Sequence, residues 1–141
     1  MSHHKSKKSW KVVIPGEDRF DPFALTIHQG DTVNWTNNDS DNHTVVSDDA
    51  INNIGPHVNQ VIQSGKTISI KFKETGQWVY YCRFHSHLDS FGQPIAPGCG
   101  ENCDQVSGIT TPVFQCCGSA IAGNFGTPMS GVITVLPKKK N

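Results

Sequence analysis

A cysteine and two histidines stand at positions from which their side chains could bind one metal ion. Cys82 ends the strand-like segment 77–82, and His85 follows in a C-x2-H step that can turn both side chains toward one point. His43 comes directly after the polar turn 37–42 and begins another strand-like segment. One thiolate and two imidazoles form the trigonal His2Cys donor set that suits copper. The spacing therefore predicts a copper site.

The segments that must position these residues are predicted to be short β-strands. They are rich in β-branched and aromatic residues and are bounded by Gly, Asn, Asp or Pro. In one of them Ile68, Ile70 and Phe72 alternate with polar residues, which is typical of a strand buried on one side. The predicted strands are 10–15, 23–28, 31–37, 43–47, 67–72, 77–82 and 131–137. Their number and spacing indicate an antiparallel all-β sandwich or barrel. Residues 50–62 are expected to hold at most one turn of helix.

The chain has 141 residues, which is the usual size of one domain. The expected domain covers residues 10–137, between basic tails at 1–9 and 138–141. Residues 88–128 are rich in Gly, Pro, Ser and Cys and show no clear strand pattern, so they are interpreted as an insertion between two strands.

Charge is distributed unevenly although the formal net charge is zero. Seven lysines lie near the two ends of the chain. The chain between them contains the other five basic residues and all twelve acidic residues, so its net charge is about −7. Aromatic and basic residues do not interleave, which argues against nucleic-acid binding. No apolar run approaches the roughly 18 residues of a membrane span. The basic first residues lack the apolar stretch of a signal peptide, and we expect an extracytoplasmic, periplasm-like protein in mature form with the signal removed.

Four of the five cysteines lie in the insertion, and they are Cys99, Cys103, Cys116 and Cys117. Adjacent cysteines rarely bond each other, so two disulfides are expected to join the first two to the last two, in either of two ways. Such bridges would staple the loop and imply an oxidising compartment. The alternative is a four-thiolate zinc or iron–sulfur site, although the C-x3-C and CC spacing departs from the usual C-x2-C pairs. Cys82 remains free for chemistry.

Three stretches resemble the cupredoxins, the type 1 blue copper proteins, and particularly plastocyanin and amicyanin. "GDTVNWTNNDSDNHTVVSDD" (30–49) is similar to the segment with the first ligand, and "SGKTISIKFKETGQWVYYCRFH" (64–85) to the strand pair that leads to the Cys and the second His. "PMSGVITV" (128–135) resembles the end of the ligand loop. The resemblance implies a Greek-key sandwich of about eight strands, one copper ion and one-electron transfer. By the same resemblance His43, Cys82 and His85 are the equatorial ligands.

The chain departs from this family at the axial ligand. In relatives with a C-x2-H step, a Met follows the His within a few residues, whereas here Leu88 stands at that place and the Met-x-Gly motif begins only at Met129. Two arrangements therefore remain open. Either the insertion is a closed excursion that returns Met129 to the axial position, or the copper is left open or bound by solvent.

The function expected from the resemblance is that of an electron carrier that docks weakly and transiently with redox partner proteins. The alternative is an open copper site that binds and converts a small molecule such as nitric oxide or nitrite. The long Cys-rich insertion is distantly similar to that of cupredoxins of ammonia-oxidising archaea, which fits the alternative. Asn42 and Thr44 flank His43 and are expected either to hold its ring orientation or the ligand loop, as outer groups of metal sites do, or to serve only the turn and the strand.

Overall fold

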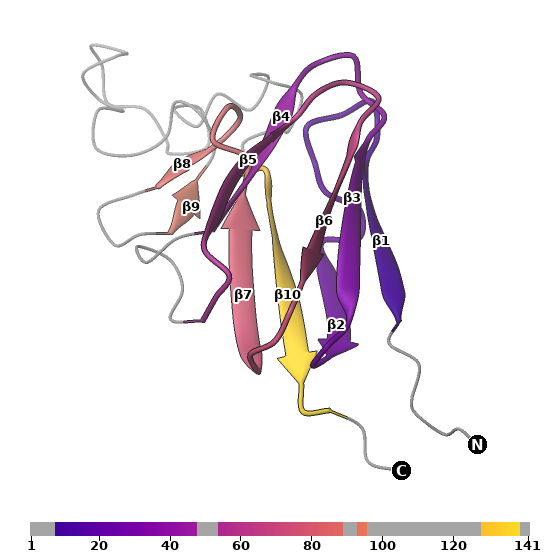
Figure 1. Ribbon diagram of the computed structural model, residues 1–141. Helices are drawn as coiled ribbons and strands as arrows, with labels where there is room; N and C mark the ends of the chain where they lie inside the picture. The colour runs from indigo at the N-terminus through magenta and orange to yellow at the C-terminus, as the bar shows by residue number, and fades with distance from the viewer. Residues whose placement is uncertain (1–7, 48–53, 89–92, 96–127, 139–141) are drawn as a thin grey trace.

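The computed structural model describes residues 8–47, 54–88, 93–95 and 128–138. All regular structure in these ranges is β-strand (Figure 1). The strands are β1 (Ser9–Ile14), β2 (Ala24–His28), β3 (Thr32–Asn37), β4 (His43–Ser47), β5 (Val58–Ile62), β6 (Thr67–Lys71), β7 (Gly76–Tyr81), β8 (His87–Leu88), β9 (Pro94–Ile95) and β10 (Ser130–Leu136). Among the described residues, no helix is long and apolar enough to span a membrane.

Eight strands form two sheets that face each other across a core (Figure 1). One sheet has the order β1-β3-β6 and the other the order β2-β10-β7-β4-β5. The predicted all-β sandwich of about eight strands is therefore confirmed. β8 and β9 pair with each other in a short ladder that belongs to neither sheet. This ladder lies at the start of the segment 88–128, for which the sequence predicts no strands.

Two of the strand pairings are parallel, which differs from the purely antiparallel ladder expected from the sequence. β1 pairs with β3, and β10 pairs with β2. The cause is the path of the chain, because β2 belongs to the opposite sheet from β1 and β3. A chain that crosses the sandwich and returns brings β1 and β3 side by side in the same direction.

The sequence allows at most one turn of helix in the segment 50–62, but the described part of it, residues 54–62, contains β5 and no helix; residues 50–53 lie outside the described residues. Three successive side chains of this strand, Asn59, Gln60 and Val61, are exposed. β5 pairs with β4 alone and forms the edge of the larger sheet. An edge strand with little burial carries no alternating pattern, so its sequence does not indicate a strand.

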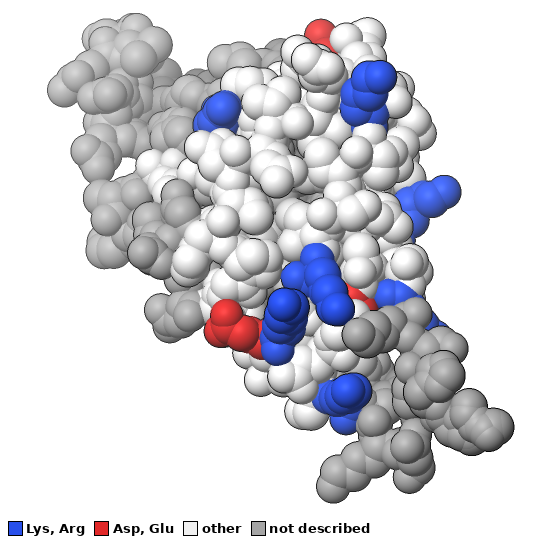
Figure 2. All heavy atoms as spheres, viewed as in Figure 1, with Lys and Arg blue, Asp and Glu red and all other residues white. Residues whose placement is uncertain are grey.

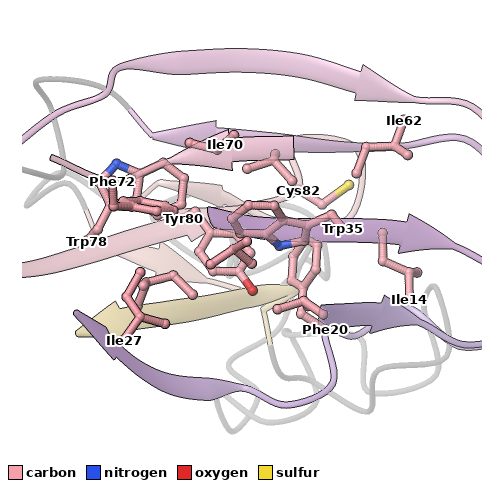
Figure 3. Close-up of a cluster of buried hydrophobic side chains, with 14 of the residues drawn as sticks. Ile14, Phe20, Ile27, Trp35, Ile62, Ile70, Phe72, Trp78, Tyr80 and Cys82 are labelled. Carbon is pink, nitrogen blue, oxygen red and sulfur yellow. The ribbon is translucent and has the colours of Figure 1, made fainter. Parts of the chain in front are cut away.

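Aromatic side chains fill the space between the sheets (Figure 3). The rings of Trp35, Trp78 and Tyr80 contact one another, with centroid distances of 5.3, 5.4 and 5.9 Å. Side chains alternate along a strand, so Trp78, Tyr80 and Cys82 all point inward from β7 and its end, and all three are fully buried. The packing of this strand therefore delivers the Cys82 sulfur into the interior at one end of the sandwich.

Candidate metal centre

The three predicted donor residues come from strand ends that meet at the same end of the larger sheet. β4 and β7 are antiparallel neighbours, with Val46 opposite Tyr81. His43, the first residue of β4, therefore lies near Cys82, which follows the last residue of β7. A turn then brings His85 back, and its backbone N–H donates a hydrogen bond to the Cys82 carbonyl over 3.3 Å. The fold thus joins residues that are 39 positions apart.

The donor atoms converge as a metal site requires. The Cys82 sulfur lies 3.7 Å from His43 Nδ1 and 3.6 Å from His85 Nδ1. A first-row ion with bonds of about 2.3 Å to sulfur and about 2.0 Å to nitrogen, in a trigonal arrangement, separates S and N by about 3.7 Å. The three residues therefore fit a metal ion bound by two histidine nitrogens and one cysteine sulfur. Two are fully buried and the side chain of His85 is 17% exposed, so this imidazole forms the outer edge of the site.

Thr44 links the two ligand segments. Its backbone N–H donates a hydrogen bond to the Cys82 sulfur over 3.3 Å, and its hydroxyl accepts one from the backbone N–H of Arg83 over 2.8 Å. Both groups come from a fully buried residue. Thr44 thus holds the ligand segments together, which is one of the roles expected for it. Asn42 instead accepts a hydrogen bond from the backbone of Ser64, away from the His43 ring.

The turn before His43 is fixed by the fully buried amide of Asn37. Its Nδ2 donates to the carbonyls of Asp41 and Ile62 over 2.8 and 2.9 Å, and its Oδ1 accepts from the backbone N–H of Asp39 over 2.9 Å. The amide therefore connects the turn to β5. This connection places Asp39 and His43 in a defined relation to each other.

Two carboxylates lie on the outer side of the imidazoles, and no local pattern in the sequence indicates them. Asp39 Oδ2 is 2.8 Å from His43 Nε2. Asp18 Oδ1 is 3.7 Å from His85 Nε2 and 3.9 Å from His43 Nε2. Asp18 comes from the loop between β1 and β2 and is 7% exposed. An Asp in a loop is typically a turn residue, so only the folded chain shows these contacts.

The pKa values of the three donor residues are coupled. Burial alone would raise the pKa of Cys82, but hydrogen bonds with His43 and His85 outweigh it and lower the pKa to about 6. The contact with Cys82 raises the pKa of His85, against the effect of burial. For His43 burial lowers the pKa, but the hydrogen bonds to Cys82 and Asp39 together raise it. The sulfur therefore ionises more readily than a free thiol, and the thiolate is the form that binds metal.

The two carboxylates differ in how their charge is balanced. Burial raises the pKa of Asp18, although His85 and His43 act in the opposite direction. For Asp39 burial would also raise the pKa, but the hydrogen bond from His43 outweighs it and the pKa is lowered. Asp39 is therefore the better compensated of the two charges.

Met129 lies opposite Cys82, one residue beyond the last pair of the β7–β10 ladder. Ser130 pairs with Tyr81, and the backbone N–H of Cys82 donates to the Met129 carbonyl over 2.9 Å. Ser86 Oγ donates to the Cys82 carbonyl over 2.5 Å and lies 3.3 Å from the Met129 carbonyl. The chain therefore returns after the insertion to the segment that it left. Met129 is fully buried.

The structure brings His43, Cys82 and His85 together as the sequence predicts, and their role as ligands stays a prediction. Leu88, which cannot coordinate, belongs to the short strand β8. The four cysteines of the insertion lie outside the described residues, and so does the expected pairing of Cys99 and Cys103 with Cys116 and Cys117. Cys82 is a free thiol.

Comparison with known proteins gives a consistent result. The family model for copper binding proteins of the plastocyanin/azurin family matches residues 11–92. Chloroplastic plastocyanin of Tetradesmus obliquus is 30% identical over 82 residues, which are 54% of this chain and 57% of that protein. Plastocyanin of a Synechococcus strain is 31% identical over 99 residues, which are 62% and 73% of the two chains. The match thus spans a little over half the length of the chloroplastic relatives.

Solved structures that match with TM-scores above 0.5 show the same fold. The Cu(I) form of an amicyanin variant matches with a TM-score of 0.54 and 16% identity, over 93% of this chain and 85% of that chain. A copper-containing nitrite reductase from Thermus scotoductus matches with a TM-score of 0.52 and 20% identity, over 90% of this chain but 22% of that chain. A purple cupredoxin from Nitrosopumilus maritimus is 31% identical, over 54% of this chain and 88% of that chain, with a TM-score of 0.46.

Proposed function

Because the chain belongs to the plastocyanin/azurin family of copper-binding proteins, we propose that it is a one-electron carrier with a copper ion held by His43, Cys82 and His85. Membership of the family confirms the predicted copper cofactor. The observation that carries the assignment to these residues is the convergence of one sulfur and two Nδ1 atoms at 3.6 and 3.7 Å. Bound copper supplies a centre that changes between Cu(I) and Cu(II) by one electron.

The residues of the chain provide an enclosed, fixed set of donors. The thiolate of Cys82 accepts a hydrogen bond from the backbone of Thr44, and burial of Cys82 and His43 excludes water from that side. Because the donors are attached to paired strands, their positions change little when the charge of the site changes. A site that reorganises little is what fast electron transfer needs.

His85 is the proposed point at which electrons enter and leave, because it is the partly exposed donor. Next to it the ring of Phe84 is 48% exposed and lies under the guanidinium of Arg83, 4.9 Å from the ring centroid. A small exposed apolar surface beside the outer imidazole suits brief contact with a redox partner protein. We infer weak, transient docking at this end of the molecule.

We also propose that Met129 is the axial donor. The supporting observation is its place directly across from Cys82, since opposite residues of an antiparallel pair project from the same face of the sheet. A fully buried Met there favours a closed site. The alternative function, conversion of nitric oxide or nitrite at an open site, requires that the thioether lie elsewhere. The likeness to nitrite reductase concerns the fold and does not favour it.

The compartment is inferred from the cysteines outside the described residues. Four thiols within 19 residues suit two disulfides, and disulfides persist in oxidising, extracytoplasmic compartments. Mass spectrometry of peptides from the non-reduced protein checks this. Peptides that join Cys99 or Cys103 to Cys116 or Cys117 are expected, and four free thiols would contradict the inference.

The test of the proposed function is the spectrum of the protein loaded with Cu(II). The wild type is expected to show an intense thiolate-to-copper absorption and a single type 1 EPR signal, both unchanged by added nitrite. Cys82→Ser should lose the absorption because the thiolate is gone, while near-UV circular dichroism shows that the fold persists. Val45→Ala is the control, since it removes buried volume close to His43 but no donor, and it should keep its colour. A coloured Cys82→Ser variant would exclude this site.

A further inference from the structure

Two carboxylates contact the imidazoles on the side opposite Cys82. His43 presents Nδ1 to the sulfur at 3.7 Å and Nε2 to Asp39 at 2.8 Å. Asp18 Oδ1 lies within ion-pair distance of the Nε2 atoms of both His43 and His85. A further acidic group, Asp41, is exposed and shares a cluster with Asp18 and His85.

Asp39 selects the tautomer of His43. An ionised carboxylate only accepts hydrogen bonds, so the Nε2 atom at 2.8 Å must carry the proton. The neutral imidazole then has its lone pair on Nδ1, which is the atom that faces Cys82. A carboxylate behind an imidazole also makes the ring a stronger donor to a metal.

The carboxylate of Asp39 is held in place by its own backbone and its neighbours. Its Oδ1 accepts a hydrogen bond from the backbone N–H of Ser40 over 2.7 Å, which leaves Oδ2 for His43. Its N–H donates to Asn37 Oδ1, and its carbonyl accepts from Ser64 Oγ over 2.6 Å. Asp39 is thus fixed in its orientation, and so is the ring that it contacts.

Asp18 contributes charge and no tautomer selection. Its oxygen lies 3.7 and 3.9 Å from the two Nε2 atoms, which is too long for a hydrogen bond but short for a charge interaction. Because Asp18 is 7% exposed, this interaction is screened by water less than a surface pair is. The negative charge of Asp18 therefore favours the more positively charged state of a metal ion bound on the Nδ1 side of the two imidazole rings.

On the basis of the proposed function, we propose that Asp39 and Asp18 are positioning residues of the copper site. Asp39 fixes the Nε2–H tautomer of His43, and both carboxylates favour Cu(II) over Cu(I) by their charge. They therefore lower the reduction potential of the site.

The experiment compares wild type with Asp39→Asn, Asp39→Ala and Asp18→Asn. Asparagine still accepts the hydrogen bond from Nε2–H but lacks the charge, whereas alanine removes both. The first readout is the ratio of Cu(II) to Cu(I) affinity, obtained from the potential. Each Asp→Asn change is expected to lower this affinity ratio about tenfold. For one electron this corresponds to a rise in the reduction potential of about 59 mV. Asp21→Asn is the control, because it removes the same charge from a carboxylate that is 60% exposed, and it should change the ratio less than about twofold.

The second readout is the hydrogen-bonded Nε2–H of His43, detected by 15N NMR in the diamagnetic Zn(II)-loaded protein through its rate of exchange with solvent. The Nε2–H signal should persist in Asp39→Asn and Asp18→Asn and be lost or exchange rapidly in Asp39→Ala. The positioning role is wrong if the wild type forms the type 1 site but all variants have the same Cu(II)/Cu(I) affinity ratio and the same His43 Nε2–H signal. The carrier function stands in that case. If the wild type forms no such site, the proposed function itself fails.

Discussion

Met129 is the residue on which the closed form of the proposed site depends. Met129→Leu replaces the thioether with a hydrocarbon of similar volume, so the fold should lose less than about 1.5 kcal/mol. If the sulfur is the axial donor, Cu(II) loses a ligand and the reduction potential rises, as measured by redox titration. Ile133→Val, on the strand β10 that directly follows Met129 and also buried, is the control and should leave the reduction potential unchanged. An unchanged potential in Met129→Leu would place the thioether outside the site.

Asn37 holds the turn that precedes the proposed ligand His43. Asn37→Ala leaves the carbonyls of Asp41 and Ile62 and the N–H of Asp39 without their partner. We expect a loss of about 2–3 kcal/mol in the free energy of unfolding, measured by urea denaturation of the metal-free protein. The neighbouring Asn38→Ala makes the same chemical change at an exposed side chain and should stay within about 0.5 kcal/mol of wild type. Equal losses for both variants would show that the buried amide has no special role.

The sequence predicts the three donors but not their outer partners. His43, Cys82 and His85 are recognisable because their types and spacing are tied to strand ends. Asp18 and Asp39 carry no such signal, since an Asp in a turn is common without any ligand nearby. The contacts of Asp18 arise when the loop between β1 and β2 folds over the end of the larger sheet, and the contact of Asp39 arises when Asn37 fixes the turn before His43.

At the scale of elements, the close pairing of β7 and β10 rests on a glycine. Gly131 lies opposite Tyr80, and a Cβ atom at this position would be 2.5 Å from Tyr80 Oη and 2.6 Å from Cζ. Tyr80 is fully buried among Phe20, Trp35 and Trp78, so its ring has little room to move. The aromatic core therefore requires glycine as the last residue of the Met-Ser-Gly segment 129–131.

Gly131→Ala should destabilise the protein by about 1–3 kcal/mol, because the added methyl group must displace the Tyr80 ring. Thermal unfolding followed by far-UV circular dichroism measures the loss. Gly16→Ala is the matched control, since a Cβ atom there meets nothing within 4 Å, and its midpoint should not fall. A Gly131→Ala variant as stable as wild type would mean that the core tolerates the shift.

Strand prediction succeeded where one face is buried and failed where burial is slight. The segment 67–72 alternates apolar and polar residues, and β6 covers Thr67–Lys71. β5 has no such alternation because most of its side chains face solvent, so its pairing with β4 could not be inferred locally. The parallel pairing of β1 with β3 also depends on which sheet β2 joins, and periodicity does not encode that choice.

At the scale of the whole molecule, the end away from the metal is tied together by Asp31. This carboxylate is 5% exposed and accepts hydrogen bonds from the Trp10 indole and from the backbone N–H groups of Lys8 and His28, at 3.0 to 3.1 Å. Lys8 and Lys71 lie on opposite sides of Thr32, since the Lys8 carbonyl accepts a hydrogen bond from the Thr32 N–H on the β1 side and Lys71 pairs with Thr32 on the β6 side. Figure 2 shows several Lys and Arg side chains in the lower half of the viewed face, beside acidic side chains, and others toward its top and right edge.

The stability of the protein should therefore depend on pH through Asp31. Burial alone would raise the pKa of Asp31, but the hydrogen bonds from Trp10, His28 and Lys8 outweigh it and lower the pKa. A lowered folded-state pKa means that the stabilisation is complete above the unfolded-state pKa of about 4 and is lost as the pH falls through the folded-state value. Asp31→Asn should lose about 1–3 kcal/mol at pH 7 and differ less from wild type at pH 2. Urea denaturation at both pH values measures this. A difference that does not shrink in acid would contradict it.

The direction of the strands has a practical consequence. β1 begins and β10 ends at the end of the sandwich opposite His43 (Figure 1). A tether fused ahead of Ser9 or after Leu136 would leave the outer imidazole uncovered. The domain could therefore be attached to a bead, a surface or a second protein by either strand and still exchange electrons with soluble molecules.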